Sequence, residues 1–395
     1  MQHLIRSARD LRADVFRGIA LWFIFINHVP GNWLGLLTIR NFMMADATEV
    51  FVFLAGYAGG IAYGLLMLRE GWFFAAARVM GRVGTLYVAH VFLFVVFTAQ
   101  VGFSAQALDR AAYLDELQMD AFGNAPYEAL VKALLLVFQP AFLNILPLYI
   151  VLLAMFAVAL PLLNRPKLLL AGSLILYFTV RHWGINLPSW TGGGWFFNPL
   201  AWQLLFVCGV VIGFAPPGRT PFRLPWSPWI LAACLGLLIP CGLAMLAVWH
   251  APEWLAALPG PWAAMLDGVD KTSLHPLRLL SLLAATYLVA HFVPRGAAWL
   301  NGALARPFVL MGQQGLPVFC SSIFLSFLGR LALEQEDGWM MQFVVNALGL
   351  LSLLAVAWVA AWYGQKLRAV KAAPNPLPPR VAPNPLPPRL AADRA

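Results

Sequence analysis

A single spacing near the start of the chain relates two side chains that can do chemistry. Arg17 and His28 are separated by Gly18–Asn27, a segment that is nearly all apolar. On an α-helix, eleven residues make about three full turns and rise about 16 Å, so both side chains share one face. An ionisable group inside a membrane is costly and normally faces a polar interior or a cavity. The spacing predicts a guanidinium and an imidazole along one polar pathway, and a satisfied core histidine is the alternative for His28.

Two carboxylates follow the histidine. Asp46 and Glu49 open a second apolar run, which reads DATEVFVFLAGY over residues 46–57. Residues three apart lie on one helical face, and a hairpin-like connection brings this face back to the level of His28. Imidazole has a pKa near neutral pH, and a neighbouring carboxylate holds its tautomer and stabilises its cation. We therefore predict that His28 acts as a general base and that Glu49 or Asp46 orients it.

The composition indicates that these residues belong to a membrane protein. Hydrophobic residues make up 61% of the 395 residues, charged residues make up 11%, and the mean hydropathy is +0.75. Many windows of about 18 or more apolar residues are long enough to cross a bilayer. No alternating β-barrel pattern is visible, so the backbone must be satisfied within helices. We predict an all-α, polytopic membrane helical bundle. Its transmembrane helices, about ten, are expected near residues 15–36, 47–68, 79–101, 145–163, 168–184, 198–214, 228–249, 276–293, 307–329 and 339–363.

The distribution of charge predicts the orientation of this bundle. Ten spans place both termini on one side of the membrane. If that side is the cytoplasm, most of the 26 lysines and arginines fall inside and most of the 17 acidic residues fall outside. This distribution follows the positive-inside rule. We therefore predict an N-in, C-in topology, with Arg17 at the cytoplasmic entrance and His28, Asp46 and Glu49 toward the outer side.

Several longer motifs carry a resemblance to a known family. The Arg17-to-His28 spacing with an FVFLxGY-type second span is similar to the acyltransferase-3 superfamily. More closely, the chain resembles the OpgC family, which is associated with succinylation of osmoregulated periplasmic glucans. Ala55 departs from the second motif, where serine is expected, so no role is assigned to a hydroxyl there. The matching segments, which reach from about residue 12 to residue 330, are RADVFRGIALWFIFINHVPGN, DATEVFVFLAGY, LYVAH, FLNILPLYIVLL, FNPLAWQLLFVCG, DKTSLHPLRLLSLLA and LPVFC.

The resemblance implies a membrane O-acyltransferase of the bacterial inner membrane whose active site opens to the periplasm. It would move a succinyl group from cytoplasmic succinyl-CoA, as co-substrate, to hydroxyls of periplasmic glucans. The four cysteines lack the spacing of metal ligands, so we expect no metal and no permanently bound cofactor. The expected partners are the acyl-CoA, the glucan and the lipid bilayer, with no nucleic acid. The apolar exterior also permits a homodimer.

Further candidate residues follow from position and residue type. Arg78 and Arg82 begin the third span on one face, where guanidinium groups offer bidentate recognition of phosphate. Together with Arg17 they are predicted to bind the donor, although topology alone explains basic residues there. A succinyl donor carries a free carboxylate, and Arg40 or Arg278 is predicted to pair with it. The remaining candidates for binding the substrate or its carboxylate lie at outer span ends: Asp270, His275, Asn144, Trp202 and Gln203.

Three other segments have their own predictions. Residues 127–142 are apolar and predict a short re-entrant or interfacial helix. Residues 185–197 are rich in glycine and tryptophan, which fits either aromatic side chains at lipid headgroups or a stacking platform for sugar rings. Residues 1–365 are expected to form one membrane domain. Residues 366–395 contain APNPLPPR twice and are expected to be a disordered, proline-rich cytoplasmic tail, either a flexible end or a PxxP docking segment.

Other functions remain open at this point. A transporter of polysaccharides or anions would use the buried histidine and acids as a proton relay, but no internal repeat typical of transporters is visible. A non-catalytic assembly subunit would not need this alignment of ionisable groups. Among enzymes, acetyl transfer to another cell-envelope polysaccharide is the alternative, and it would not require an arginine on the outer side.

Overall fold

The computed structural model describes residues 9–216, 218, 222, 224–251, 253, 260 and 268–372. Over these residues the chain is helical, with one isolated β-bridge between Pro188 and Gly194, which confirms the predicted fold class. The longer helices are α1 (Leu11–Asn27), α2 (Ala47–Glu70), α3 (Trp72–Ala107), α7 (Ile145–Ala159), α8 (Pro166–Trp183), α9 (Pro199–Gly213), α10 (Pro228–His250), α13 (Pro276–Phe292), α15 (Gly315–Gln335) and α16 (Trp339–Ala372). The shorter ones are η1 (Trp33–Leu37), η2 (Ile39–Asn41), α4 (Ala112–Glu116), α5 (Asp120–Asn124), α6 (Pro126–Leu134), η3 (Leu160–Asn164), η4 (Ala298–Asn301) and α14 (Ala305–Gln313).

Six helices in the described part of the chain are long and apolar enough to cross a membrane. They are α2, α3, α7 with η3, α10, α15 and α16. Helices α9 and α13 are also apolar but shorter. A polytopic membrane bundle is therefore confirmed, whereas the count of about ten spans and the N-in, C-in orientation stay predictions.

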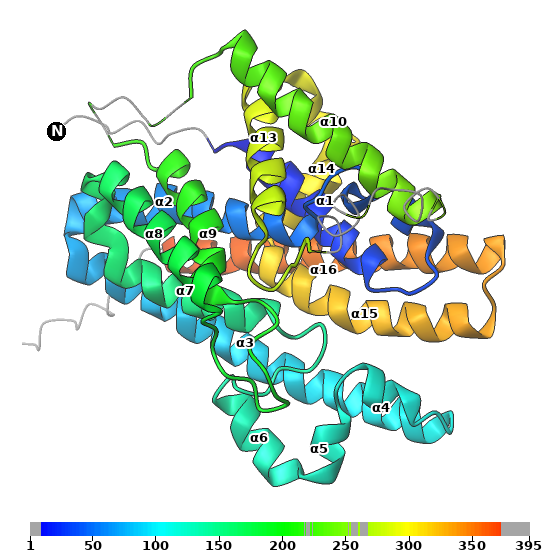
Figure 1. Ribbon diagram of the computed structural model, residues 1–395. Helices are drawn as coiled ribbons and strands as arrows, with labels where there is room; N and C mark the ends of the chain where they lie inside the picture. The colour runs from blue at the N-terminus through cyan, green and yellow to red at the C-terminus, as the bar shows by residue number, and fades with distance from the viewer. Residues whose placement is uncertain are drawn as a thin grey trace, which may run out of the picture.

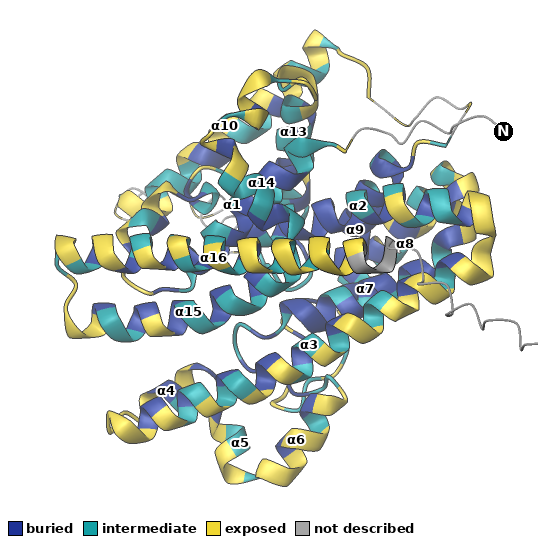
Figure 2. Ribbon diagram, turned by 180° about the vertical axis from the view of Figure 1, so that it is seen from behind, coloured by how far each residue is buried: buried dark blue, intermediate teal, exposed yellow. Residues whose placement is uncertain are grey.

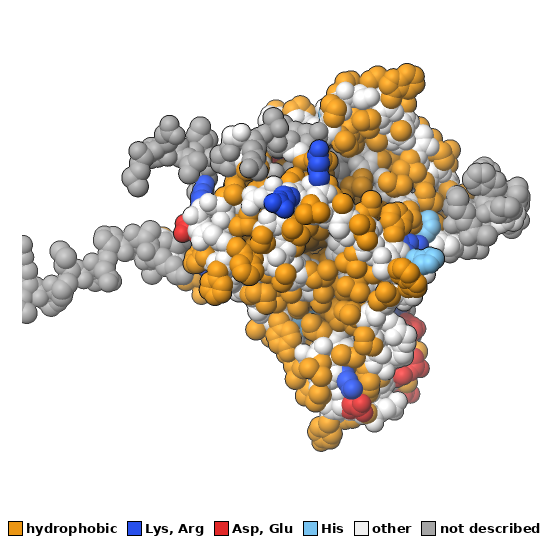
Figure 3. Space-filling model, turned by 60° about the vertical axis from the view of Figure 1, so that its left-hand side comes forward, with side chains coloured by type: hydrophobic (Ala, Val, Ile, Leu, Met, Phe, Trp, Pro, Cys, Tyr) orange, Lys and Arg blue, Asp and Glu red, His pale blue; other side chains and the backbone are white. Residues whose placement is uncertain are grey.

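The bundle has two ends, and short helices project from its body. We call the end where α1 begins the Arg12 end, and the opposite end, where α1 finishes, the His28 end. Figure 1 shows α10 and α13 leaning out at the top and α4–α6 projecting at the bottom. Burial follows this arrangement, because exposed residues line the outward faces of α10 and α16 in Figure 2. The surface seen in Figure 3 is largely hydrophobic, and most of its acidic side chains gather on the part that projects below.

The first helix is shorter than the predicted span 15–36. It ends at Asn27 and is capped by His28, whose φ and ψ are −93° and 1°. Pro30 and Gly31 follow, and Gly31 has φ +75°, a left-handed conformation that favours glycine. The chain then turns through η1 and η2 instead of continuing as helix. The prediction that His28 lies well inside a helix is therefore wrong, and His28 lies at the turn.

Glycines bring α2 and α9 into backbone contact. On α2, Gly56 and Gly60 face the carbonyl oxygens of Phe206 and Val210; a Cβ at these glycines would lie 2.1 and 2.2 Å from the oxygens. On α9, Gly209 faces α2 in the same way, with 2.2 Å between its would-be Cβ and a carbonyl oxygen. Such small-xxx-small pairs are typical of closely packed membrane helices. They fix α2, and with it Asp46 and Glu49, against α9.

The predicted span 307–329 is broken into two helices, α14 and α15. The break falls at Gln314, whose φ and ψ are −110° and 40°. Arg17 donates to the carbonyl of Gly312 at 3.4 Å and to that of Leu54 on α2 at 2.9 Å. Gln313 donates to Asp14 at 3.3 Å. Because freed backbone groups in a membrane protein need partners, Arg17 braces this break against α1 and α2.

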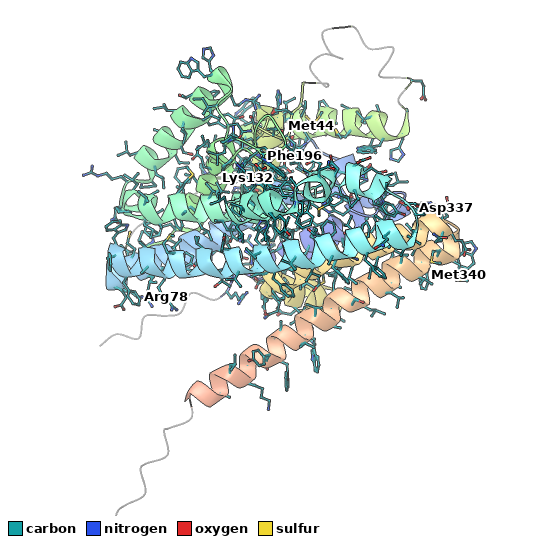
Figure 4. The ribbon with its side chains drawn as sticks, turned by 90° about the horizontal axis from the view of Figure 1, so that it is seen from below. Met44, Arg78, Lys132, Phe196, Asp337 and Met340 are labelled. Carbon is teal, nitrogen blue, oxygen red and sulfur yellow. The ribbon has the colours of Figure 1, made fainter. Side chains whose placement is uncertain are left out.

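The last helix extends beyond the predicted domain boundary. Helix α16 continues to Ala372, so the boundary predicted between residues 365 and 366 lies within it. Figure 4, seen from below, shows α16 leaving the other helices toward its C-terminal end. The proline-rich repeat that follows lies outside the described residues.

Candidate active site

A cavity of about 1230 Å³ lies at the His28 end of the bundle. Its wall combines the end of α1, η2, the start of α2, the α4–α5 segment, the loop at 186–197 and the residues that precede α13. Polar, charged and aromatic side chains line this wall. We call this space the His28 cavity, and of the predicted site residues His28, Arg40, Asp46 and Asn144 line it.

The His28 ring is held by the helix that it caps. Its Nδ1 lies 2.6 Å from the carbonyl oxygen of Ile24. A carbonyl only accepts, so Nδ1 carries the hydrogen and Nε2 is left as an acceptor. The ring also packs edge-on against Phe142, with 4.4 Å between the ring centroids. Because Nε2 makes no hydrogen bond to a described residue, it is available to accept a proton from a molecule in the cavity.

The predicted pairing of His28 with a carboxylate is wrong. Asp46 and Glu49 form a capping box at the start of α2: Thr48 N–H donates to Asp46 at 2.7 Å and Asp46 N–H donates to Glu49 at 2.9 Å. Two cations bind the remaining carboxylate oxygens: Lys271, in the segment that precedes α13, and Arg278, in the first turn of α13. Lys271 lies 2.5 Å from Asp46, and Arg278 lies 3.2 Å from Asp46 and 2.7 Å from Glu49.

These four charged side chains are partly buried and pair with one another. Glu49 is fully buried, and Arg278 is largely so. Burial alone would raise the pKa of Asp46, but the charges of Lys271 and Arg278 and the hydrogen bonds from Lys271 and Thr48 outweigh burial and hold this pKa well below its usual range. Asp46 is therefore an anion at neutral pH. It serves as a counter-ion to Lys271 and Arg278 rather than as a partner of the imidazole.

Arg40 is the arginine of the cavity that keeps free hydrogen-bond donors. Its guanidinium lies over the Trp249 ring, 4.6 Å from the centroid. It forms no ion pair with a described residue, and its Nε is buried without a hydrogen-bond partner there. Arg278, the other candidate for a carboxylate, is already engaged by two acids. Because Arg40 lines the cavity and pairs with no acid of a described residue, whereas Arg278 pairs with two, the geometry favours Arg40 as the group that can bind an anion.

The glycine- and tryptophan-rich loop forms a wall of the His28 cavity. Gly192 and Gly193 have φ of +101° and +64°, values that glycine adopts without strain. Asn186 donates to the Trp195 carbonyl at 2.9 Å and closes the loop. Phe196 is half exposed and lies near the centre of the molecule in Figure 4. Of the two sequence interpretations, the placement of this loop on the cavity wall favours a stacking platform.

The segment predicted as a short interfacial helix also reaches the cavity. A helix does form there, α6, followed by an irregular stretch in which Leu136 and Phe142 have positive φ. That stretch carries Gln139 and Phe142 to the cavity wall. Its membrane placement stays a prediction.

An ion-pair network anchors the neighbouring wall, α4, to α15. Arg330 pairs with Glu116 on α4 and with Glu334, at 2.6 Å. Arg110 adds a pair with Glu334 at 3.0 Å. The wall that carries Asp115 is therefore fixed to the bundle through its charges.

Three predicted donor-binding arginines lie away from the cavity. Arg17 is engaged with backbone carbonyls at the break between α14 and α15. Arg78 is exposed and Arg82 is half-buried, both near the start of α3. Figure 4 places Arg78 at the opposite end of the view from Asp337 and Met340. Their role in binding a donor stays a prediction.

The remaining predicted residues support the segment that precedes α13. Leu277 N–H donates to Nδ1 of His275 at 3.2 Å, so His275 caps α13. Burial lowers the pKa of His275, and the charge of Arg181 lowers it further. Asp270 pairs with Arg181 at 3.2 Å.

Two buried side chains on α9 were also predicted for the substrate. Trp202 donates its indole N–H to the carbonyls of Lys271 and Thr272, at 3.1 Å each, and so positions Lys271. Gln203 bonds to Ser173 on α8, 2.6 Å away, and does not line the cavity. Lys271 itself was missed as a site residue, although it stands in a sequence segment with the predicted Asp270 and His275.

Comparison with known proteins supplies a family. A family model described as OpgC protein matches residues 9–365. No curated protein and no solved structure matches the chain.

Proposed function

Because the chain belongs to the OpgC family, we propose that it is a membrane O-acyltransferase that moves a succinyl group from succinyl-CoA to hydroxyls of periplasmic glucans. The imidazole of His28 carries this proposal. It lines a large polar cavity, its Nδ1 is held by a carbonyl, and its Nε2 makes no hydrogen bond to the described residues. A general base for acyl transfer needs such an acceptor within reach of the attacking hydroxyl.

The chemistry would proceed in two steps within the His28 cavity. Nε2 of His28 removes the proton of a glucan hydroxyl while that oxygen attacks the thioester carbonyl. The resulting tetrahedral intermediate has an oxyanion, for which Lys271 and Asn144 on the same wall offer N–H donors. The intermediate then collapses, the new ester remains on the glucan, and the departing thiolate takes the proton back from His28.

Arg40 distinguishes a succinyl donor from an acetyl donor. A succinyl group ends in a carboxylate, which pairs with guanidinium through two parallel hydrogen bonds. The guanidinium of Arg40 is the one in the cavity without an anionic partner among the described residues. Acetyl transfer to another polysaccharide is the alternative, and it leaves this arginine without a ligand.

The aromatic and polar walls suit a sugar acceptor. Phe196 and its loop offer flat apolar surfaces for pyranose faces, and Asp115, Gln118 and Asn124 across the cavity offer partners for hydroxyls. We place this cavity on the periplasmic side of the inner membrane and the Arg12 end in the cytoplasm. There Arg78 and Arg82 would hold the phosphates of the CoA, and its arm would pass Arg17 toward His28. The exposed apolar helices contact the bilayer and permit a homodimer.

The test is mass spectrometry of periplasmic glucans from cells that lack this protein and are complemented with variants. We expect wild type to restore succinyl groups and His28→Ala to restore none at equal membrane abundance. His182→Ala, an exposed histidine at the end of α8, is the matched control and should behave as wild type. Full restoration by His28→Ala would refute the role of the base. Loss of the glucans from the periplasm, rather than of their decoration, would support a transporter instead.

A further inference from the structure

A second cavity, of about 600 Å³, lies at the Arg12 end of the bundle. It is bounded mainly by α1, α2, α9 and α13, and we call it the Tyr57 crevice. Its wall is mostly apolar and includes Phe16, Phe53, Ile212, Leu283 and Val289. Polar groups of a ligand would therefore find few partners inside it, whereas a hydrocarbon chain would need none.

The mouth of the Tyr57 crevice is charged. Asp10 pairs with Arg12 at 2.8 Å and with Arg295 at 3.3 Å, and the hydroxyl of Tyr57 donates to Asp10 at 3.0 Å. Two guanidinium groups against one carboxylate leave a net positive charge. Arg295 is 56% exposed, so its remaining N–H groups are available to an anion outside the mouth.

The Tyr57 crevice is separated from the His28 cavity. On α2 the lining of the crevice begins at Phe53, and the lining of the cavity ends at Thr48. Glu49 precedes Phe53 by one turn on the same helical face, and it is bound there by Arg278 from α13. A buried ion pair therefore lies between the two spaces.

These observations together define a ligand with one long apolar chain and an anionic group at its end. The arm of an acyl-CoA fits less well, because a mostly apolar wall offers few partners for its two amides and the Glu49–Arg278 pair lies between the crevice and His28. We infer that the Tyr57 crevice binds one acyl chain of an anionic phospholipid, whose phosphate lies at the exposed Arg295. This site is independent of the proposed acyl transfer.

The test uses photo-crosslinking of the full chain in phosphatidylcholine vesicles. Two tracer lipids, a phosphatidylglycerol and a phosphatidylcholine, carry the same photoreactive acyl chain, and peptide mass spectrometry locates the adducts. Adducts on crevice residues of α1, α2 and α13 are compared with those on the lipid-exposed face of α16. We expect the anionic tracer to label the crevice about fivefold more than the neutral one, the effect of one cation at an anionic lipid.

Two variants with matched controls locate the effect. Ala290→Trp fills the crevice from an exposed position and should abolish its labelling, whereas Ala171→Trp, exposed on the neighbouring α8, should not. Arg295→Gln should remove the preference for the anionic tracer, whereas Arg306→Gln, exposed at the same end, should keep it.

Four results would overturn the inference. Equal labelling by both tracers would show that the negative net charge of the headgroup is not recognised. Displacement by excess inorganic phosphate would show a phosphate site without a chain. Displacement by succinyl-CoA would show a donor site, and loss of crevice labelling as the number of chains per vesicle is raised would show a protein contact. The readout is not acyl transfer, so this inference and the proposed function stand or fall separately.

Discussion

The His28 cavity and the Tyr57 crevice lie toward opposite ends of the same helices and offer opposite chemistry. The cavity is about twice as large and presents an oriented imidazole and a guanidinium that pairs with no acid of the described residues. The crevice is apolar and keeps its charges at the mouth. Helices α1 and α2 and the α13 segment contribute to both, so one small set of elements supports two environments. The Glu49–Arg278 ion pair lies between the cavity and the crevice.

The largest effect is expected from removing the proposed base, His28, from the cavity. His28→Ala should lower the rate of succinyl transfer by about 10²–10⁴-fold, the usual contribution of general base catalysis. Transfer is measured with succinyl-CoA and glucan in proteoliposomes. Lipid labelling of the Tyr57 crevice should not change. A variant that loses both would show that His28 holds the structure rather than the chemistry.

The second prediction concerns the Glu49–Arg278 ion pair, which lies between the cavity and the crevice. Arg278→Leu leaves Glu49 buried without its cation, which costs about 3–5 kcal/mol of stability. Thermal unfolding in detergent measures the loss, and the double variant with Glu49→Leu should recover most of it. The control is Arg181→Leu, whose pair with Asp270 is more exposed and is worth about 0–1 kcal/mol. Equal losses in the two single variants would contradict a buried ion pair.

A smaller effect would test whether Arg40 in the cavity binds the carboxylate of a succinyl donor. Arg40→Gln should lower kcat/KM for succinyl-CoA by about 10- to 150-fold, the value of a hydrogen bond to a charged group. With acetyl-CoA the same variant should match wild type. Paired kinetics with both donors is the measurement. A uniform loss with both donors would place Arg40 in the scaffold of the site.

The smallest effect concerns the cap of α13, next to the Glu49–Arg278 ion pair. The pKa of His275 is lowered in the folded protein. The unfolded chain then binds the proton first, so stability is fully present above about pH 6.5 and falls as the pH drops below it. His275→Asn keeps a capping acceptor that does not titrate. Its melting temperature should vary less than that of wild type between pH 7.5 and 5.5, and an unchanged slope would assign the titration to another group.

Much of this arrangement was predictable because charges are rare in apolar segments. His28, Asp46 and Arg40 stand at the ends of strongly apolar runs, and the helical bundle requires such residues to meet at one level. The partner of His28 was not predictable in the same way. Pro30 and Gly31 stop the helix, and the last carbonyls of any helix are open to side chains. At this turn, Nδ1 of His28 therefore bonds to the carbonyl of Ile24 and not to a carboxylate.

Ion pairs between residues far apart in the sequence were the second feature that could not be predicted. Lys271 and Arg278 reach Asp46 and Glu49 from α13, which no local spacing relates to α2. The opposite charges of the two segments were visible, but their contact depends on how α9 positions both. Trp202 on α9 bonds to the carbonyl of Lys271, and Gly209 lets α9 lie against α2. Trp202, which was predicted to bind substrate, and Gly209, which had no predicted role, thus decide where the charges meet.

The brace formed by Arg17 bears on how mutational screens of this protein should be read. If the proposed function holds, a screen scored by glucan decoration would rank Arg17 with His28, since loss of either is expected to remove the signal. Yet the Arg17 guanidinium ties two carbonyls on α2 and α14, so its loss should first lower the yield of folded protein in the membrane. Immunoblotting of the membrane fraction alongside the decoration assay would separate a depleted protein from an inactive one.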